Sequence, residues 1–200
     1  MNPQAATVRR RWPLVLIGTL FLGPFIAAYI LYFYFPQVRP AGAVNHGQLV
    51  DPARPLPMLG LQDADGKPAP PGLLRDKWSL IYIGQASCDE ACAHRLYLTR
   101  QVRTRLNGDR SRVQRVYLAP DAAALGAVRA QLGAEHPDML WLVDTDAPGQ
   151  RFSDFVDAKV EGEVYLTDPL GNWVMSYQPD FEPAGLYKDL KHLLKLSGIG

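Results

Sequence analysis

The chemistry that this chain could perform is concentrated in one segment, GQASCDEACAHR, residues 84–95. It contains Cys88 and Cys92, the only two cysteines among the 200 residues. Two thiols separated by three residues can close a disulfide or chelate a thiophilic ion such as Cu(I). A disulfide between them would close a very small loop and would constrain the unfolded chain little. The spacing therefore favours a reactive dithiol, with a structural disulfide as the open alternative.

The two cysteines fall where a predicted strand ends and a predicted helix begins. Residues 78–84, WSLIYIG, are rich in aromatic and β-branched residues, which indicates a buried strand. Residues 89–106 place apolar side chains three or four positions apart, which is typical of a helix with one buried stripe. Because the N-terminal end of a helix stabilises a thiolate, this position favours Cys88 as the nucleophile. Cys92 lies one turn further along the same face and can reach back to Cys88.

Strands and helices alternate in the rest of the chain. Strands are predicted at 113–119, 139–144, 163–168 and 173–178, and helices at 121–133, 146–156 and 182–198. This order predicts parallel strand pairing in a three-layer α/β/α sandwich, with the last two strands forming an antiparallel hairpin at one edge. Residues 61–69, LQDADGKPA, predict a further hairpin turn.

The N-terminal part of the chain has the composition of a membrane anchor. Residues 13–35 contain no charged side chain, and as a helix they would be long enough to cross the hydrocarbon core of a bilayer. The apolar stretch exceeds that of an ordinary signal peptide, and no A-x-A-like cleavage site comes after it. Arg9, Arg10 and Arg11 precede it whereas only Arg39 lies close beyond it, so we expect a cytoplasmic N-terminus and an exported remainder. In a bacterium that remainder would lie in the oxidising periplasm.

Charge and proline content characterise the chain beyond the apolar stretch. The whole chain has 21 basic and 20 acidic residues, and the four arginines at 9–39 leave 17 basic against 20 acidic beyond residue 39. This slightly acidic remainder excludes a typical nucleic-acid-binding domain. Residues 36–72 hold eight prolines and show no helical period, which predicts an extended tether leading into the domain.

Residues 56–196 resemble the Sco/SenC family, whose members are membrane-anchored thioredoxin-fold factors that assemble the copper centre of cytochrome c oxidase. The resemblance is carried by the apolar N-terminus, LQDADGK, WSLIYIG, the CxxxC of SCDEAC, and YLTDPLGNWV, which is similar to the family's YLIDPxG. It implies a bacterial inner-membrane protein made of a cytoplasmic N-terminus at 1–12, a transmembrane anchor at 13–35, a tether at 36–55 and a periplasmic thioredoxin-like domain at 56–200. It also implies that Cys88 and Cys92 are a redox pair and Cu(I) ligands, with cytochrome c oxidase subunit II or another periplasmic thiol protein as partner.

Two positions depart from the family pattern. The family's copper-binding histidine corresponds to Val160, five residues before Tyr165, and the proline after the first family cysteine corresponds to Asp89. Two thiolates can hold Cu(I), but Cu(II) prefers nitrogen and oxygen donors that valine does not supply. These departures favour thiol-disulfide exchange over metal transport. The rival hypothesis is a membrane-tethered binding or scaffold protein that has this fold and no copper role.

The remaining ionisable residues have ordinary interpretations. Each histidine is expected to be solvated or locally bonded, with His94 facing away from Cys92. The four histidines are His46, His94, His136 and His192. Seven arginines lie within residues 95–115, and such a run predicts a solvated helix face or, alternatively, a docking surface for an acidic partner or an anionic membrane.

Overall fold

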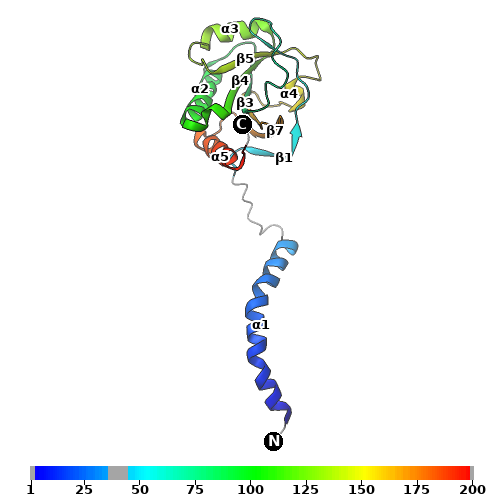
Figure 1. The fold of residues 1–200 in the computed structure, drawn as a ribbon. Coiled ribbons are helices and arrows are strands. Elements are labelled where there is room, and N and C mark those ends of the chain that lie inside the picture. The colour runs from blue at the N-terminus through cyan, green and yellow to red at the C-terminus, as the bar shows by residue number, and fades with distance from the viewer. Residues whose placement is uncertain (1–2, 36–44, 199–200) are drawn as a thin grey trace. The chain divides into compact units, whose positions relative to one another are not determined.

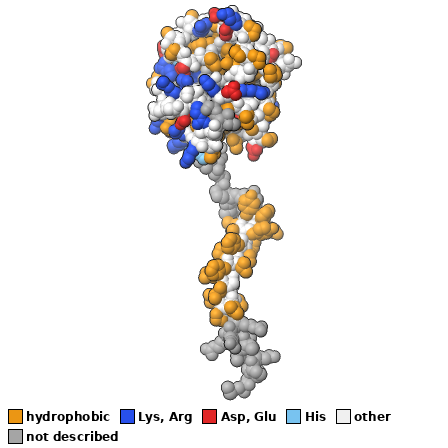
Figure 2. Space-filling model, in the orientation of Figure 1, with side chains coloured by type: hydrophobic (Ala, Val, Ile, Leu, Met, Phe, Trp, Pro, Cys, Tyr) orange, Lys and Arg blue, Asp and Glu red, His pale blue; other side chains and the backbone are white. Residues whose placement is uncertain are grey.

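The protein, seen here as a computed structural model, is described over residues 3–35 and 45–198 (Figure 1). It divides into two compact units, Met1–Ala43 and Val44–Gly200. The first unit contains the helix α1 (Pro3–Tyr34), in which Trp12–Tyr34 form a 23-residue stretch with a mean hydropathy of 2.3. The side chains of this stretch that are visible in Figure 2 are apolar. By length and composition it could cross a membrane, and a signal sequence would share both properties.

The second unit is built on one mixed sheet of seven strands in the order β1-β7-β6-β3-β4-β5-β2. The central strands β3 (Trp78–Ile83), β4 (Val113–Ala119) and β5 (Met139–Asp144) are parallel. The hairpin of β6 (Val164–Thr167) and β7 (Asn172–Tyr177) pairs antiparallel with β3 through β6. The predicted parallel core and terminal hairpin are confirmed, and β3 is a continuous apolar run because both of its faces are covered.

Three helices cover one face of this sheet: α2 (Glu90–Arg105), α3 (Ala122–Leu132) and α5 (Pro183–Leu196). A short 3₁₀ helix, η2 (Asn107–Arg112), comes after α2, which also packs against α5. The apolar stripe predicted for 89–106 is the buried stripe of α2, which includes Cys92, Leu96 and Val102. Helix and sheet side chains form one continuous core on this face.

The other face of the sheet is covered more thinly. Here the helix α4 (Phe152–Phe155) and the segment around Leu74 pack on Ile81 and Leu118. The sequence predicted a longer helix, 146–156, and that prediction is wrong in extent. Asp144 accounts for the late start, because its carboxylate accepts the Phe152 N–H at 2.7 Å and the segment before Phe152 forms turns.

The strands at the two edges of the sheet come from residues 48–63, where the sequence predicted a tether and the start of the 61–69 hairpin. β1 (Gln48–Pro55) pairs antiparallel with β7, so residues 48–55 belong to the sheet and the tether prediction is wrong there; the prediction for 36–44 lies outside the described residues. Prolines are tolerated in β1 because it is an edge strand with an irregular register between Leu49 and Arg54. β2 (Leu61–Asp63) pairs with β5, and the predicted turn is present at Gly66, whose φ is 75°.

Candidate redox site

Cys88 and Cys92 are joined by a disulfide, with their Cα atoms 5.3 Å apart. Cys88 lies after the exposed loop 85–87 that leaves β3, and Cys92 lies in the first turn of α2. Both residues are buried, with 5% and 6% of their surfaces exposed. The structure thus brings the two predicted site residues together in the oxidised form of the dithiol.

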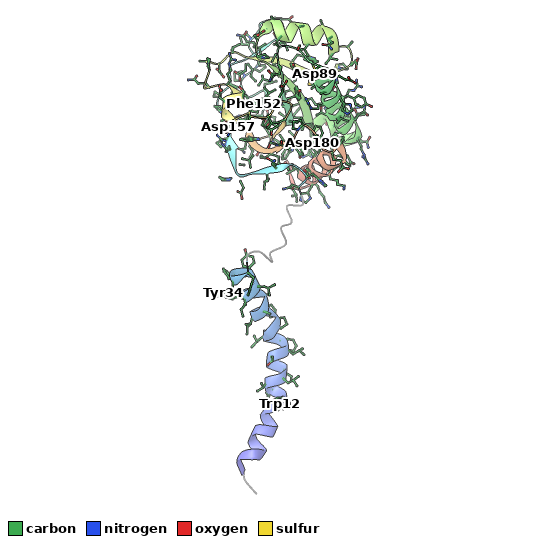
Figure 3. All side chains as sticks on the ribbon, turned by 180° about the vertical axis from the view of Figure 1, so that it is seen from behind. Trp12, Tyr34, Asp89, Phe152, Asp157 and Asp180 are labelled. Atoms are coloured by element: carbon green, nitrogen blue, oxygen red, sulfur yellow. A yellow bond between two sulfur atoms is a disulfide. The ribbon has the colours of Figure 1, made fainter. Side chains whose placement is uncertain are left out.

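The start of α2 is capped by Asp89, a role that the sequence analysis did not assign. The Asp89 carboxylate accepts the Cys92 N–H at 2.8 Å, so it satisfies one of the free amide groups at the helix N-terminus. Figure 3 labels Asp89 beside this helix. An aspartate directly before an amphipathic helix is the signal that could have identified this cap. The carboxylate also places a negative charge between the two cysteines in the chain, which opposes thiolate formation there.

An aromatic cluster on the helix-covered face of the sheet lies in the same core as the cysteines. Tyr82 on β3 stacks on Tyr117 of β4 with a centroid distance of 5.8 Å, and Tyr117 contacts Trp141 of β5 at 5.3 Å. Gly84 makes room for this packing, because a Cβ at that position would clash with the Tyr117 hydroxyl. Burial raises the pKa of Tyr117 to about 12.

Charged groups surround the Tyr82 hydroxyl. Arg95, one turn beyond Cys92 on α2, donates from Nη1 to Tyr82 Oη at 3.1 Å. Its guanidinium lies so close to Gly162 that a Cβ there would clash with Nη1. Burial raises the pKa of Tyr82 and outweighs Arg95, which lowers it. The negative charges of Glu161 and Asp89 raise this pKa further. The cysteine-bearing helix is thereby connected to β3 and to the loop that contains Val160.

A cavity of about 310 Å³ opens at the carboxyl ends of β3, β4 and β5, where open α/β sheets bind ligands. Its lining includes Gln85, Asp144 and Val160, and Val160 is 44% exposed. Burial raises the pKa of Asp144, which outweighs the hydrogen bonds from Phe152 and Asp146. Neither cysteine is among the described residues that line the cavity, although Gly84 and Gln85, which precede Cys88 in the chain, are.

The histidines do not join the cysteines in the part of the chain that the structure describes. His94 is exposed and stacks on Tyr97, facing outward as expected, while His192 is exposed on α5. His136 is buried beside Arg115, and burial together with the nearby guanidiniums lowers its pKa to about 4. Across residues 3–35 and 45–198, no group of three or more His, Cys, Asp or Glu residues is placed to hold a metal ion. The described donors therefore do not fit a three-ligand copper site.

Most of the arginine run binds parts of the domain together, so its interpretation as a solvated face is wrong. Arg115 is 1% exposed and donates to Thr99 and Asp138. Others reach neighbouring segments: Arg103 to Asp138, Arg112 to the carbonyls of Leu194 and Ser197, and Arg105 to the ring of Tyr187. A run of one charge on a helix does not reveal such partners, since they come from distant parts of the sequence.

Comparisons with known proteins agree with this fold. A family model described as "Transmembrane-like, thioredoxin-like, C-terminal domain" matches residues 78–197. Apo Sco1 from Thermus thermophilus is similar with a TM-score of 0.59 and 18% identity, over 76% of this chain and 99% of that one. Copper-bound ScoI from Arabidopsis thaliana is similar with a TM-score of 0.57 and 16% identity, over 70% of this chain and 98% of that one. At such identities the likeness establishes the fold alone.

A third structure concerns redox chemistry directly. BsSco, described as a member of the Sco family of cytochrome c oxidase assembly proteins in which a disulfide switch was identified, has a TM-score of 0.56 and 16% identity, over 75% of this chain and 99% of that one. No curated protein sequence matches the chain.

Proposed function

The chain belongs to the transmembrane-like, thioredoxin-like C-terminal domain family, and from this premise we propose that it is a membrane-anchored thiol-disulfide exchange factor in cytochrome c oxidase assembly. Cys88 is the nucleophile and Cys92 the resolving thiol. The domain works in the periplasm of a bacterium, held to the inner membrane by the apolar stretch of α1. Its partner is a thiol protein of that compartment, with oxidase subunit II as the first candidate.

The observation that carries this proposal is where the disulfide lies. It joins the residue before the Asp89 cap to the first turn of the same helix, so it connects no two distant elements. Its loop is too short to restrict the unfolded chain strongly. The sheet is meanwhile held by two apolar cores, one on each face. A bond that contributes little to the scaffold and lies at the strand-to-helix junction of a thioredoxin-like fold supports an exchange function.

The reaction balances without a cofactor. The Cys88 thiolate attacks a disulfide of the partner, which forms a mixed disulfide and releases one partner thiolate. The Cys92 thiolate then attacks the Cys88 sulfur, which releases the second partner thiolate and closes the Cys88–Cys92 bond. Two electrons pass to the partner, whose two thiolates take up protons from water. An external dithiol reductant restores the starting state.

Copper delivery is the second candidate function, favoured by the copper-bound structure of a similar fold. Here Cu(I) would be cargo, held by the reduced Cys88 and Cys92 thiolates, since soft sulfur donors suit Cu(I). Val160, at the position of the family histidine, supplies no donor atom. We expect the reduced chain to bind one Cu(I) and to hold Cu(II) poorly, and Val160→His to strengthen Cu(II) binding in a titration of both forms. Tight Cu(II) binding by the unmodified chain would contradict this expectation.

Trapping the mixed disulfide tests the exchange function. In cells that make the full chain with Cys92→Ser, we expect Cys88 to remain bonded to subunit II, detected as a reducible adduct and identified by mass spectrometry. Cys88→Ser is the matched control and should give no adduct. The scaffold alternative makes the opposite prediction, because a double cysteine-to-serine chain would then support oxidase activity as well as the natural chain does.

A further inference from the structure

The hydroxyl of Tyr117 is the buried polar group that the fold leaves without a partner at the cysteine end of the sheet. Tyr117 is 0% exposed, and its Oη finds no hydrogen-bond partner among the described residues. Two other buried atoms share this property, Trp78 Nε1 and Thr167 Oγ1, but both lie at the opposite end of β3, where Ser79 pairs with Thr167. An unmade hydrogen bond in a core is costly, so its persistence at this place calls for a function.

The hydroxyl lies at the end of β3 from which the chain leads to Cys88. Gly84 comes directly after β3, and a Cβ there would clash with Tyr117 Oη, so the hydroxyl reaches the backbone four residues before Cys88. From the neighbouring helix α3, Gln131 donates to the Cys88 carbonyl at 3.5 Å. Tyr117 and both cysteines belong to one apolar core.

We propose that the Tyr117 hydroxyl is the internal hydrogen-bond donor to the Cys88 thiolate that exists once the disulfide is open. This rests on the proposed exchange function and names a positioning residue for it. A disulfide sulfur is a weak acceptor, whereas a thiolate is a charged one, and hydrogen bonds to charged groups are about twice as strong as neutral ones. The donor is thus unsatisfied in the oxidised state and satisfied in the reduced state.

The neighbouring tyrosine shows what a satisfied hydroxyl looks like in the same cluster. Tyr82 pairs with Tyr117 in the parallel register of β3 and β4, and it is similarly buried. Its Oη accepts from Arg95, an interaction that does not involve sulfur and should persist in both redox states. Asp89 and Glu161 act on this hydroxyl as negative charges, and Arg95 as a positive one. Since the negative charge of Asp89 opposes a thiolate at the site, a neutral hydrogen-bond donor such as the Tyr117 hydroxyl would stabilise that thiolate.

Tyr117→Phe tests the proposal, with Tyr82→Phe as the matched control. The full chain in detergent is equilibrated with glutathione redox buffers, and its thiols are counted by alkylation. We expect Tyr117→Phe to shift the equilibrium toward the disulfide by about tenfold and to raise the thiol pKa of Cys88, since the reduced state alone loses a charge-assisted bond. In urea unfolding, the oxidised variant should gain stability and the reduced variant should lose it. Tyr82→Phe should leave the glutathione equilibrium within about twofold.

Each other outcome decides against the proposal. Equal stability changes in the two redox states of Tyr117→Phe, with an unchanged glutathione equilibrium, would overturn the role of this hydroxyl and leave the exchange function intact. An equal shift in Tyr82→Phe would show that the aromatic cluster, not the Tyr117 hydroxyl, sets the equilibrium. A natural chain whose disulfide dithiothreitol opens only on unfolding would overturn the exchange function and this proposal together.

Discussion

Arg115 and Tyr117 lie two residues apart on the same face of β4, and the structure treats their polar groups in opposite ways. Arg115 donates to Thr99 Oγ1 at 3.0 Å, to Asp138 at 3.1 Å and to the Leu96 carbonyl at 2.5 Å. Tyr117 Oη, equally buried, has no partner among the described residues. Arg115 is therefore part of the scaffold, where its buried guanidinium has partners. Tyr117 belongs to the candidate site, where one donor stays unbonded until the disulfide is reduced.

Replacing Arg115, the scaffold residue of this pair, should have the largest effect on the free energy of unfolding. Arg115→Met removes the group that joins α2 to the segment before β5. Asp138 then loses one of the two guanidiniums that bind it and keeps Arg103, while Thr99 Oγ1 and the Leu96 carbonyl each lose a buried donor. We expect the free energy of unfolding to fall by about 3 kcal/mol. Urea unfolding of the detergent-solubilised chain, followed by near-ultraviolet circular dichroism, measures it. Arg110→Met in η2, where the side chain is exposed, is the control and should change stability by less than about 0.5 kcal/mol; a similarly small effect of Arg115→Met would contradict the assignment.

His136 makes the same scaffold sensitive to acid. Its pKa falls from 6.5 to about 4 through burial and the charges of Arg115 and Arg100, which outweigh Asp138 and Glu135. Because the unfolded chain binds this proton more tightly, the contribution to stability is full above pH 6.5 and is lost as the pH falls toward 4, by roughly 3 kcal/mol. His136→Gln should lose most of that pH dependence in unfolding titrations. An unchanged slope in the variant would place the acid sensitivity in other groups.

The smallest expected effect concerns the charge of Asp89 beside the cysteine pair. Asp89 caps α2 and Asp121 caps α3, each accepting an N–H at 2.8 Å. Asparagine caps as well as aspartate, so both Asp→Asn variants should unfold within about 0.5 kcal/mol of the natural chain. We expect only Asp89→Asn to move the glutathione equilibrium toward the dithiol, by about threefold, because it removes a negative charge beside Cys92. A shift of equal size in Asp121→Asn would show that the effect is not local.

The sequence predicted the central elements well and the edges poorly, for identifiable reasons. β3, β4 and β5 are short apolar runs and α2 has one apolar stripe, and all four lie within one or two residues of their predicted bounds. β1 is proline-containing, almost fully exposed and recognisable only through its pairing with β7. The four-residue α4 depends on Asp144, a contact from another element. Local pattern therefore identified the elements buried on two faces and missed those defined by a neighbour.

The candidate site divides in the same way. The cysteine pair, its position at a strand end and the outward direction of His94 follow from spacing alone. The burial of Arg115 could not be predicted, because nothing in the local sequence distinguishes it from the other six arginines or indicates its distant partners. The unsatisfied hydroxyl of Tyr117 is likewise invisible in an apolar strand, since it is defined by the absence of an acceptor or donor among its described neighbours.

The central claim is that Cys88–Cys92 is a redox couple on a scaffold that stands without it, and a redox titration tests it most directly. The full chain in detergent is equilibrated across glutathione buffers while free thiols and near-ultraviolet circular dichroism are recorded on the same samples. We predict that the disulfide opens in one two-electron step and that the tertiary signal and cooperative unfolding are retained in the reduced chain. A disulfide that stays closed until the domain unfolds, or a tertiary signal lost on reduction, would contradict the account and identify the bond as structural.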